Sequence, residues 1–195
     1  MWIAMAADYE TSGEVTAAPI LLLGDSRLRQ VFVPVTDFMD PAFVSNQRRL
    51  HATLAAFRRA NGFGRAISAP QIGVSQRFVA LNLGDGPRLL VNPEIAWTSQ
   101  ETFTMWDDRM SFPSLLVRVR RHESISVHYL DERGYPHDWL RLNQATSELL
   151  QHEIDHLDGI LAVDRALDDE SLVMREVFEA QRAYFVSQVN YVIGV

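Results

Sequence analysis

Two histidines stand four positions apart in the segment His152-Glu153-Ile154-Asp155-His156. Residues four apart lie on one face of a helix, so both imidazoles can bind a single metal ion. Glu153 follows the first histidine, where its carboxylate can take a proton from a metal-bound water. A divalent ion lowers the pKa of that water to about 7, which makes hydroxide available at neutral pH. The pattern therefore predicts the helix of a metal-dependent hydrolase.

The same spacing also fits an exposed helix with two surface histidines and a solvated acid. That alternative is disfavoured because apolar residues flank the histidines, as expected of an embedded helix: Leu149, Leu150, Ile154 and Leu157. We expect Asn143 to cap the helix and Asp158-Gly159 to end it.

The elements that must position this helix form an α+β pattern. Apolar spacing after the Asp40 cap predicts a helix over Pro41–Ala60, and a last helix over Asp168–Ala183. Strands are predicted between them, with a turn at Glu132-Arg133-Gly134: Arg77–Leu83, Leu89–Ile95, Leu116–Val119, Ser124–Leu130 and Trp139–Leu142. Strands grouped between helices, without a regular βαβ rhythm, indicate mixed or antiparallel strands around the central helix. Residues 1–18 are expected to form a flexible tail and residues 19–195 a single domain.

The composition of the 195-residue chain excludes several kinds of reactive site and several classes of protein. Cysteine is absent and all 18 basic residues are arginine, which excludes disulfides, thiolate ligands and lysine Schiff bases. The net charge of −7 argues against a nucleic-acid surface. No apolar run approaches the roughly 20 residues of a membrane span, and the first eighteen residues carry no basic residue of a signal peptide. We expect a cytoplasmic protein.

The residues around the histidines resemble the signatures of peptide deformylases. The run from Gln151 to Gly159, followed by Asp164-Arg165, is similar to the third signature of that family. Gly64 through Gln71 matches the first signature in position. Further matches are Ile20–Val35, Asn92-Pro93-Glu94-Ile95, and Ser111, Pro113, Val119 and Arg121. The resemblance covers residues 20 to about 166.

The resemblance implies an enzyme that removes the formyl group from N-formylmethionyl peptides, or from a small acyl amide, using Fe(II), Zn or Ni. His152 and His156 would bind the metal, and Glu153 would be the general acid and base. The side-chain amide of Gln71 and the backbone N–H of Met110 would donate to the oxyanion. Two residues of the first signature, Gly64 and Ala66, would lie along the substrate.

The second signature departs from the family, whose third metal ligand is a cysteine. Arg109 stands at that position, within Asp107-Asp108-Arg109-Met110-Ser111. Arginine stays protonated and has no lone pair to offer a metal. In the first signature Ala66 and Ser68 replace a glycine and an alanine, so a Cβ would reshape the substrate groove. Asp107 with Arg121 could preserve the family's Glu–Arg pair in shorter form.

Three hypotheses remain open from the sequence. In the leading one, His152, His156 and a carboxylate from Asp107 or Asp108 bind metal, and an N-formyl or related amide is hydrolysed. In the second, no metal is bound, and Arg109 takes its place and pairs with Glu153. Arg109 and Gln71 then bind a substrate oxygen, and Glu153 acts as a base on a different substrate, for proton transfer or for hydrolysis of another acyl amide. In the third, the protein binds a peptide or small ligand without turnover.

The C-terminal region bears on partners. After residue 165 it has five acids and two arginines, so a basic helix for docking on the ribosome is absent. Residues 183–195 carry no charged side chain and hold eight large apolar or aromatic side chains. They are expected to pack on the chain's own sheet, and the alternative is a homodimer contact. Trp106 could line a substrate pocket or fill the core.

Overall fold

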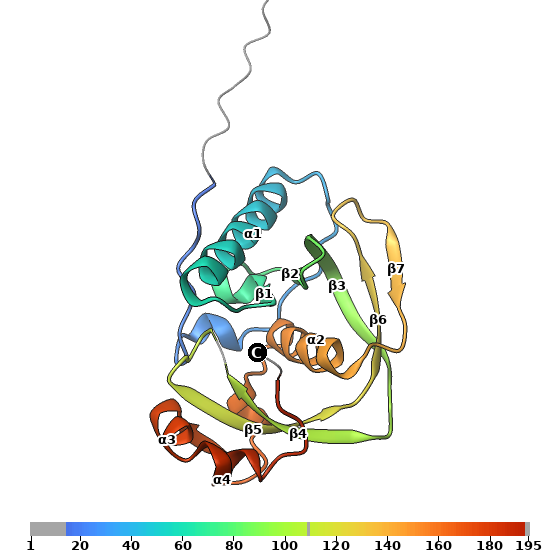
Figure 1. Cartoon of the computed structure of the whole chain (residues 1–195). Helices are drawn as coiled ribbons and strands as arrows, with labels where there is room; N and C mark the ends of the chain where they lie inside the picture. Colours follow the sequence, from blue (N-terminus) through green and yellow to red (C-terminus); the bar gives the residue numbers. More distant parts are fainter. Residues whose placement is uncertain (1–14, 109, 194–195) are drawn as a thin grey trace, which may run out of the picture.

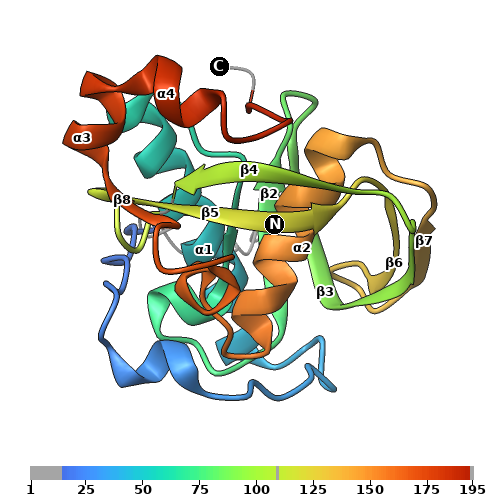
Figure 2. The same cartoon turned by 90° about the horizontal axis from the view of Figure 1, so that it is seen from below.

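Two antiparallel sheets enclose a central helix, α2 (Figures 1 and 2). The structure, a computed structural model, describes residues 15–108 and 110–193. The larger sheet has the order β1 (Ala66–Ser68), β2 (Phe78–Asn82), β3 (Pro87–Thr98), β6 (Ile125–Leu130) and β7 (Pro136–Trp139). The smaller has the order β4 (Thr102–Asp108), β5 (Leu115–His122) and β8 (Leu172–Met174). The helices are α1 (Pro41–Asn61), α2 (Gln144–Leu157), α3 (Arg175–Ala180) and α4 (Arg182–Val186), with 3₁₀ turns at Ser26–Arg29, Ala69–Ile72 and Ala162–Arg165.

Helix α2 is embedded between the sheets, and every residue from Thr146 to Leu157 is buried. Its apolar side packs against the larger sheet, through a cluster that includes Leu150, Ile154, Val79, Leu81 and Val127. On its other side, the Gln151 side chain accepts a hydrogen bond from the backbone N–H of His122 on β5 (2.9 Å) and donates one to its carbonyl (2.8 Å). The predicted ends are confirmed, because the Asn143 side chain caps the first turn and the C-cap is Asp158. The helix carrying the two histidines is thus a core element.

Helix α1 covers the opposite face of the larger sheet near β1 and β2 (Figure 1). Phe43, Leu50 and Leu54 are buried there against Phe78 and its neighbours. The Asp40 carboxylate accepts from the N–H of Ala42 (3.0 Å), which satisfies a donor of the first turn. The prediction of a helix over residues 41–60 is therefore confirmed.

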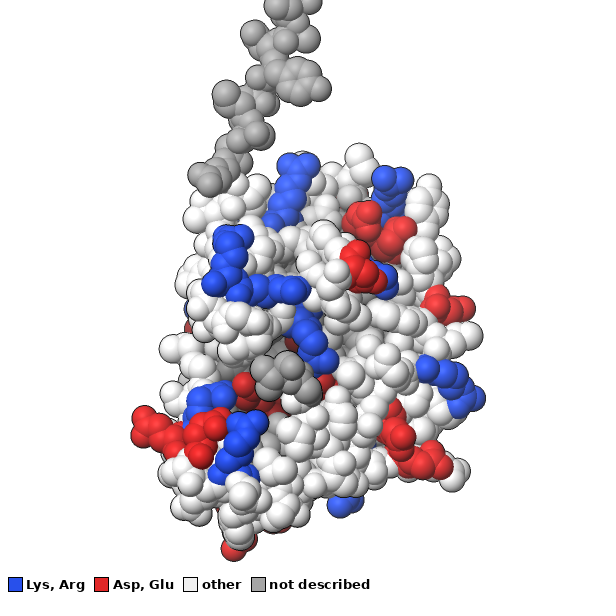
Figure 3. Space-filling model, in the orientation of Figure 1, with Lys and Arg blue, Asp and Glu red and all other residues white. Residues whose placement is uncertain are grey.

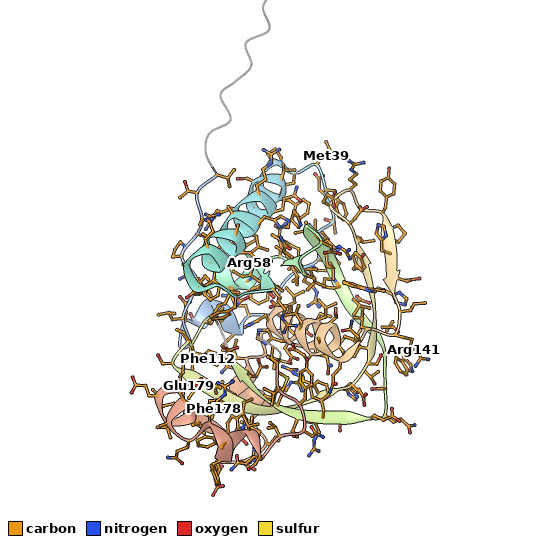
Figure 4. All side chains as sticks on the ribbon, viewed as in Figure 1. Met39, Arg58, Phe112, Arg141, Phe178 and Glu179 are labelled. Carbon is orange, nitrogen blue, oxygen red and sulfur yellow. The ribbon has the colours of Figure 1, made fainter. Side chains whose placement is uncertain are left out.

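The two faces of the smaller sheet have different neighbours. Phe103, Met105 and Asp107 of β4 lie opposite Arg121, Val119 and Val117 of β5. That face looks toward α2, since Arg121 bonds to Asp155 on that helix. Because strand residues alternate, Trp106 and Asp108 point to the other face. There Trp106 packs against Phe185 of α4 and Phe178 of α3. Phe178 is labelled in Figure 4. The alternation separates the two adjacent aspartates.

Three sequence predictions need correction. Strand Thr102–Asp108 is not among the predicted strands, and its three consecutive buried residues, 105–107, do not alternate with exposed ones. The strand predicted over Trp139–Leu142 lies earlier, at Pro136–Trp139, where it pairs with β6 across the expected turn. The helix predicted over Asp168–Ala183 is instead strand β8 followed by two short helices. Residues 172–174 pair with residues 115–117 of β5, and that pairing outweighs their helical spacing. The other four predicted strands are confirmed within a few residues.

The C-terminal segment packs on its own chain, as predicted for its described residues. The Phe185 ring lies 5.4 Å from the Trp106 ring, and Trp106 Nε1 donates to the Phe185 carbonyl (2.8 Å). The Tyr191 ring lies 4.9 Å from Phe103. Trp106 is therefore a core residue, and a homodimer contact through this segment stays a prediction.

Residues 1–14, most of the predicted tail, lie outside the described residues. The N–H of Ala18 donates to Thr53 on α1 (2.8 Å), so the chain joins the core by this point. Among the described helices none has the length and apolar character needed to cross a membrane.

Candidate functional site

The carboxylate of Glu153 is held inside the protein by Ser68. Glu153 is 3% exposed and Ser68 is fully buried. The Ser68 hydroxyl donates a hydrogen bond to Glu153 Oε2 and lies 3.1 Å from the Glu153 carbonyl oxygen. The contact joins the end of β1 to the middle of α2. In the sequence, Ser68 stands out only as a departure from the first signature. A serine in place of an alanine adds a hydrogen-bond donor, and that difference was the available indication of this contact.

Gln71 is oriented by both ends of its side-chain amide. It lies in the 3₁₀ turn Ala69–Ile72 and is 2% exposed. Its Oε1 accepts a hydrogen bond from the backbone N–H of Ser68 (2.9 Å). This contact fixes the orientation of the amide, and the Nε2 end points away from Ser68. Nε2 donates to Ser111 Oγ at 3.3 Å, a long hydrogen bond. The amide N–H groups are thus directed toward the segment that carries Met110.

Residues 110 and 111 are held against this turn. The carbonyl of Ser111 accepts from Leu23 N–H (2.9 Å), and the carbonyl of Gln71 accepts from Leu21 N–H (2.8 Å). Residues 21–23 therefore connect Gln71 to Ser111. The two predicted oxyanion donors, Gln71 and Met110, come from segments that this bonding brings together.

The two predicted substrate-binding residues of the first signature have different surroundings. Gly64 has φ of +118°, and a Cβ there would meet Met110 Cε and the Phe57 ring at 3.0 Å. A glycine is required for this backbone and for the approach of Met110. Ala66 is 4% exposed and packs into the core cluster around α2. Substrate contact by either residue stays a prediction.

His152 and His156 lie together, as their spacing predicts. Their ring centroids are 4.4 Å apart, and the side chains are 6% and 0% exposed. His152 Nε2 is 3.9 Å from Glu153 Oε1. The alternative of surface histidines on a solvated helix is therefore wrong.

A third metal donor is not supplied by Asp108. Its carboxylate accepts from Arg175 Nη2 (2.9 Å) on the face of the smaller sheet that looks away from α2. Asp107 is on the α2 face and 2% exposed, and Arg109 lies outside the described residues. Across residues 15–108 and 110–193, no group of three or more His, Cys, Asp or Glu side chains is arranged to hold a metal ion. The donor set described here does not fit the three-ligand metal centre that the resemblance implies.

An ion triad lies on the α2 face of the smaller sheet. Asp155 accepts from Arg121 Nη1 (2.5 Å) through Oδ2 and from Arg165 Nη2 (2.7 Å) through Oδ1. The hydrogen bond that Arg165 donates to the Asp155 carboxylate raises the pKa of the Arg165 guanidinium. The suggested pairing of Asp107 with Arg121 is wrong, because the Arg121 side chain bonds to Asp155. Asp155, inside the histidine motif, thus anchors α2 to β5.

Comparison with known proteins agrees with this architecture. The model of the polypeptide deformylase family matches residues 17–171. The peptide deformylase of Thermotoga maritima is 35% identical over 158 residues, which span 80% of this chain and 92% of that protein. A peptide deformylase-like protein of Brucella melitensis is 36% identical over 172 residues, 83% of this chain and 96% of the relative.

Solved structures give the same result. The crystal structure of the Thermotoga maritima peptide deformylase superposes with a TM-score of 0.71 at 33% identity, over 78% of this chain and 99% of that one. A peptide deformylase from Legionella pneumophila gives 0.72 at 30% identity, over 89% and 97%. With the family model spanning most of the sequence, the chain belongs to the polypeptide deformylase family.

Proposed function

We propose that this protein hydrolyses a small N-acyl amide of the formyl-peptide type without a resident metal ion, with Glu153 as the general base. The observation that carries the proposal is the buried Glu153 carboxylate, bonded to Ser68 and next to the Gln71 turn. Glu153 and Gln71, which the resemblance gives as acid/base and oxyanion donor, are present, whereas an arginine stands at the position of the third metal ligand. Membership of a family of amide hydrolases supports the class of substrate.

In the proposed reaction, Glu153 takes a proton from a water molecule whose oxygen attacks the acyl carbon. The carbonyl oxygen becomes an oxyanion that accepts from Gln71 Nε2 and from the N–H of Met110. Such donors are each worth about 2.7–4 kcal/mol of barrier. The C–N bond then breaks, Glu153 returns the proton to the leaving amine, and a carboxylic acid and an amine are released.

Arg109 supports the proposal through its charge alone. Arginine stays protonated at every pH at which the protein would be folded, so a positive charge occupies the sequence position of the family's metal ligand. A cation repels a second cation and attracts a developing oxyanion, and both effects are stronger in a low-dielectric site than in water. The substitution thus replaces one source of positive charge by another.

The test is hydrolysis by protein freed of metal with a chelator. N-formylmethionyl and N-acetylmethionyl tripeptides are offered, and the released amine is measured. We expect turnover of the formyl peptide by the wild type and a loss of about 10²-fold or more in Glu153→Gln. Glu148→Gln is the matched control, because Glu148 is also a buried carboxylate of the same helix (2% exposed) and its partner is Arg65.

Two results would contradict the proposal. The first is turnover that requires added Fe(II), Zn or Ni and is lost with chelator, which would mean that the reaction depends on a metal ion. Binding of the formyl peptide without hydrolysis would make the protein a binder. Arg109→Cys serves as the positive control of the assay, because it supplies the thiolate that the family uses.

A further inference from the structure

The loop between β4 and β5 carries Met110 and Ser111, and its far side faces the C-terminal segment. Strand β8 pairs with the start of β5, with Leu115 opposite Met174. That register places the next residue, Arg175 at the start of α3, beside the loop. In Figure 1 helix α3 lies near the ends of β4 and β5. The family model stops at residue 171, so Arg175 belongs to a segment that this match does not cover.

Arg175 contacts both ends of the loop. Its backbone N–H donates to the Ser114 carbonyl (2.8 Å), and its Nε donates to the Pro113 carbonyl (2.6 Å). Its Nη2 donates to Asp108 Oδ2 (2.9 Å). The guanidinium is planar and its donors have a fixed geometry, so bonding at Nε and Nη2 together fixes Asp108 relative to Pro113. One side chain thus sets the distance between the loop's two ends.

The opposite side of the loop is held at Ser111. Leu23 N–H and Gln71 Nε2 both donate to that residue. The described part of the loop therefore has anchors on two sides, one in the N-terminal segment with Gln71 and one at Arg175. Charged side chains of both signs gather over α3 in the space-filling view (Figure 3).

We propose that Arg175 is a positioning residue that holds residues 110–114 relative to Asp108, so that the N–H of Met110 is directed at the acyl oxygen of the substrate. This inference rests on the proposed function for its role, and on the three Arg175 contacts for its geometry. It assigns a part in the site to the C-terminal segment.

The contacts of Arg175 are not needed to hold the C-terminal helices. Trp106 packs against Phe178 and Phe185, and Trp106 Nε1 bonds to the Phe185 carbonyl. The ion pair of Arg175 with Asp108 is about one-third exposed on each side, and such pairs add little to global stability. Loss of Arg175 should therefore act on the loop and leave the unfolding transition nearly unchanged.

The experiment compares full-length Arg175→Ala and Arg175→Lys with wild type. Hydrogen exchange of amides 110–115 and the kcat and KM for the N-formylmethionyl tripeptide are measured. We expect Arg175→Ala to exchange about tenfold faster in this loop and to lose about tenfold in kcat, with KM within twofold. Arg175→Lys keeps the positive charge near Asp108 but lacks the fixed pair of donors. Its exchange rate and kcat should therefore lie between those of Arg175→Ala and the wild type. Arg182→Ala is the control, because Arg182 pairs with Glu179 on the exposed surface.

Loop exchange in Arg175→Ala that matches Arg182→Ala would overturn the proposal. Faster exchange with an unchanged kcat would also overturn it, since the loop would then be braced without effect on the reaction. If the wild type hydrolyses none of the peptides, the proposed function fails, and the exchange data alone decide whether Arg175 fixes the loop.

Discussion

The hydroxyl of Ser68 donates a hydrogen bond to the carboxylate of Glu153, which ties strand β1 to the centre of helix α2. Both residues are almost fully buried. Burying a carboxylate costs free energy unless the carboxylate is hydrogen-bonded. This contact therefore stabilises the folded protein and fixes the orientation of the Glu153 side chain. An alanine, which the family resemblance implies for this position, has no hydroxyl and could not donate this hydrogen bond.

Ser68→Ala tests this relationship. Removal of the hydroxyl leaves the buried carboxylate with one partner fewer, so we expect the free energy of unfolding to fall by about 1–3 kcal/mol. The urea midpoint measures this fall. Ser147→Ala is the control for stability, because Ser147 is also fully buried and bonds to the His122 carbonyl (2.9 Å) on the other side of α2. Only Ser68→Ala should also reduce hydrolysis of the formyl peptide, and equal turnover in both variants would contradict the role given to Ser68.

The arrangement of the histidine helix could be predicted from sequence because local signals agree. Asn143 caps it, Asp158-Gly159 ends it, and the spacing of His152 and His156 places both rings together. At Gly159 a Cβ would lie 2.6 Å from the Gln30 carbonyl oxygen, so the helix end also requires a glycine for close packing.

Contacts between distant segments could not be predicted in this way. Arg175 reaches Asp108 across 67 positions, and Arg121 reaches Asp155 across 34. The sequence offers several acids to each arginine, and only the strand register chooses among them. The alternation of β4 sends Asp107 toward α2 and Asp108 away from it. Two adjacent carboxylates that looked interchangeable as metal ligands therefore have different surroundings.

Asp155→Asn should destabilise the protein strongly. Arg121 is 4% exposed at its side chain, and its Nε and Nη2 have no hydrogen-bond acceptor among the described residues, so Asp155 supplies its counter-charge. Removing one partner of a buried ion pair costs about 3–5 kcal/mol. Urea unfolding measures the loss. The matched control is Asp138→Asn, whose 61% exposed carboxylate pairs with His128, and it should change stability by less than about 0.5 kcal/mol.

Acid sensitivity should arise in part at His51 on α1. Burial lowers the pKa of His51 from its usual 6.5, and the nearby Glu132 carboxylate opposes this. Above pH 6.5 the imidazole is neutral in both states and the stability is fully present. As the pH falls below 6.5 the unfolded chain binds the proton first, so stability is lost until the folded pKa is passed.

His51→Gln should flatten this part of the stability profile, measured as urea midpoints between pH 7.5 and pH 5. Glu132→Gln should steepen it, because the charge that favours the protonated imidazole is removed. A profile in His51→Gln as steep as that of the wild type would assign the acid sensitivity to other groups.

Arg109→Cys should restore metal binding. Two imidazoles already lie 4.4 Å apart on α2, and a thiolate at position 109 would complete the three-ligand set that the family resemblance implies. We expect about one equivalent of Fe, Ni or Zn in the variant by elemental analysis, and far less in the wild type. Arg109→Ala separates the two effects of the substitution, because it removes the positive charge without adding a ligand. Metal bound by the alanine variant would show that charge repulsion alone excludes the ion. One equivalent of metal in the wild type, lost in His156→Ala, would show that a third ligand exists and that Arg109 does not replace the metal.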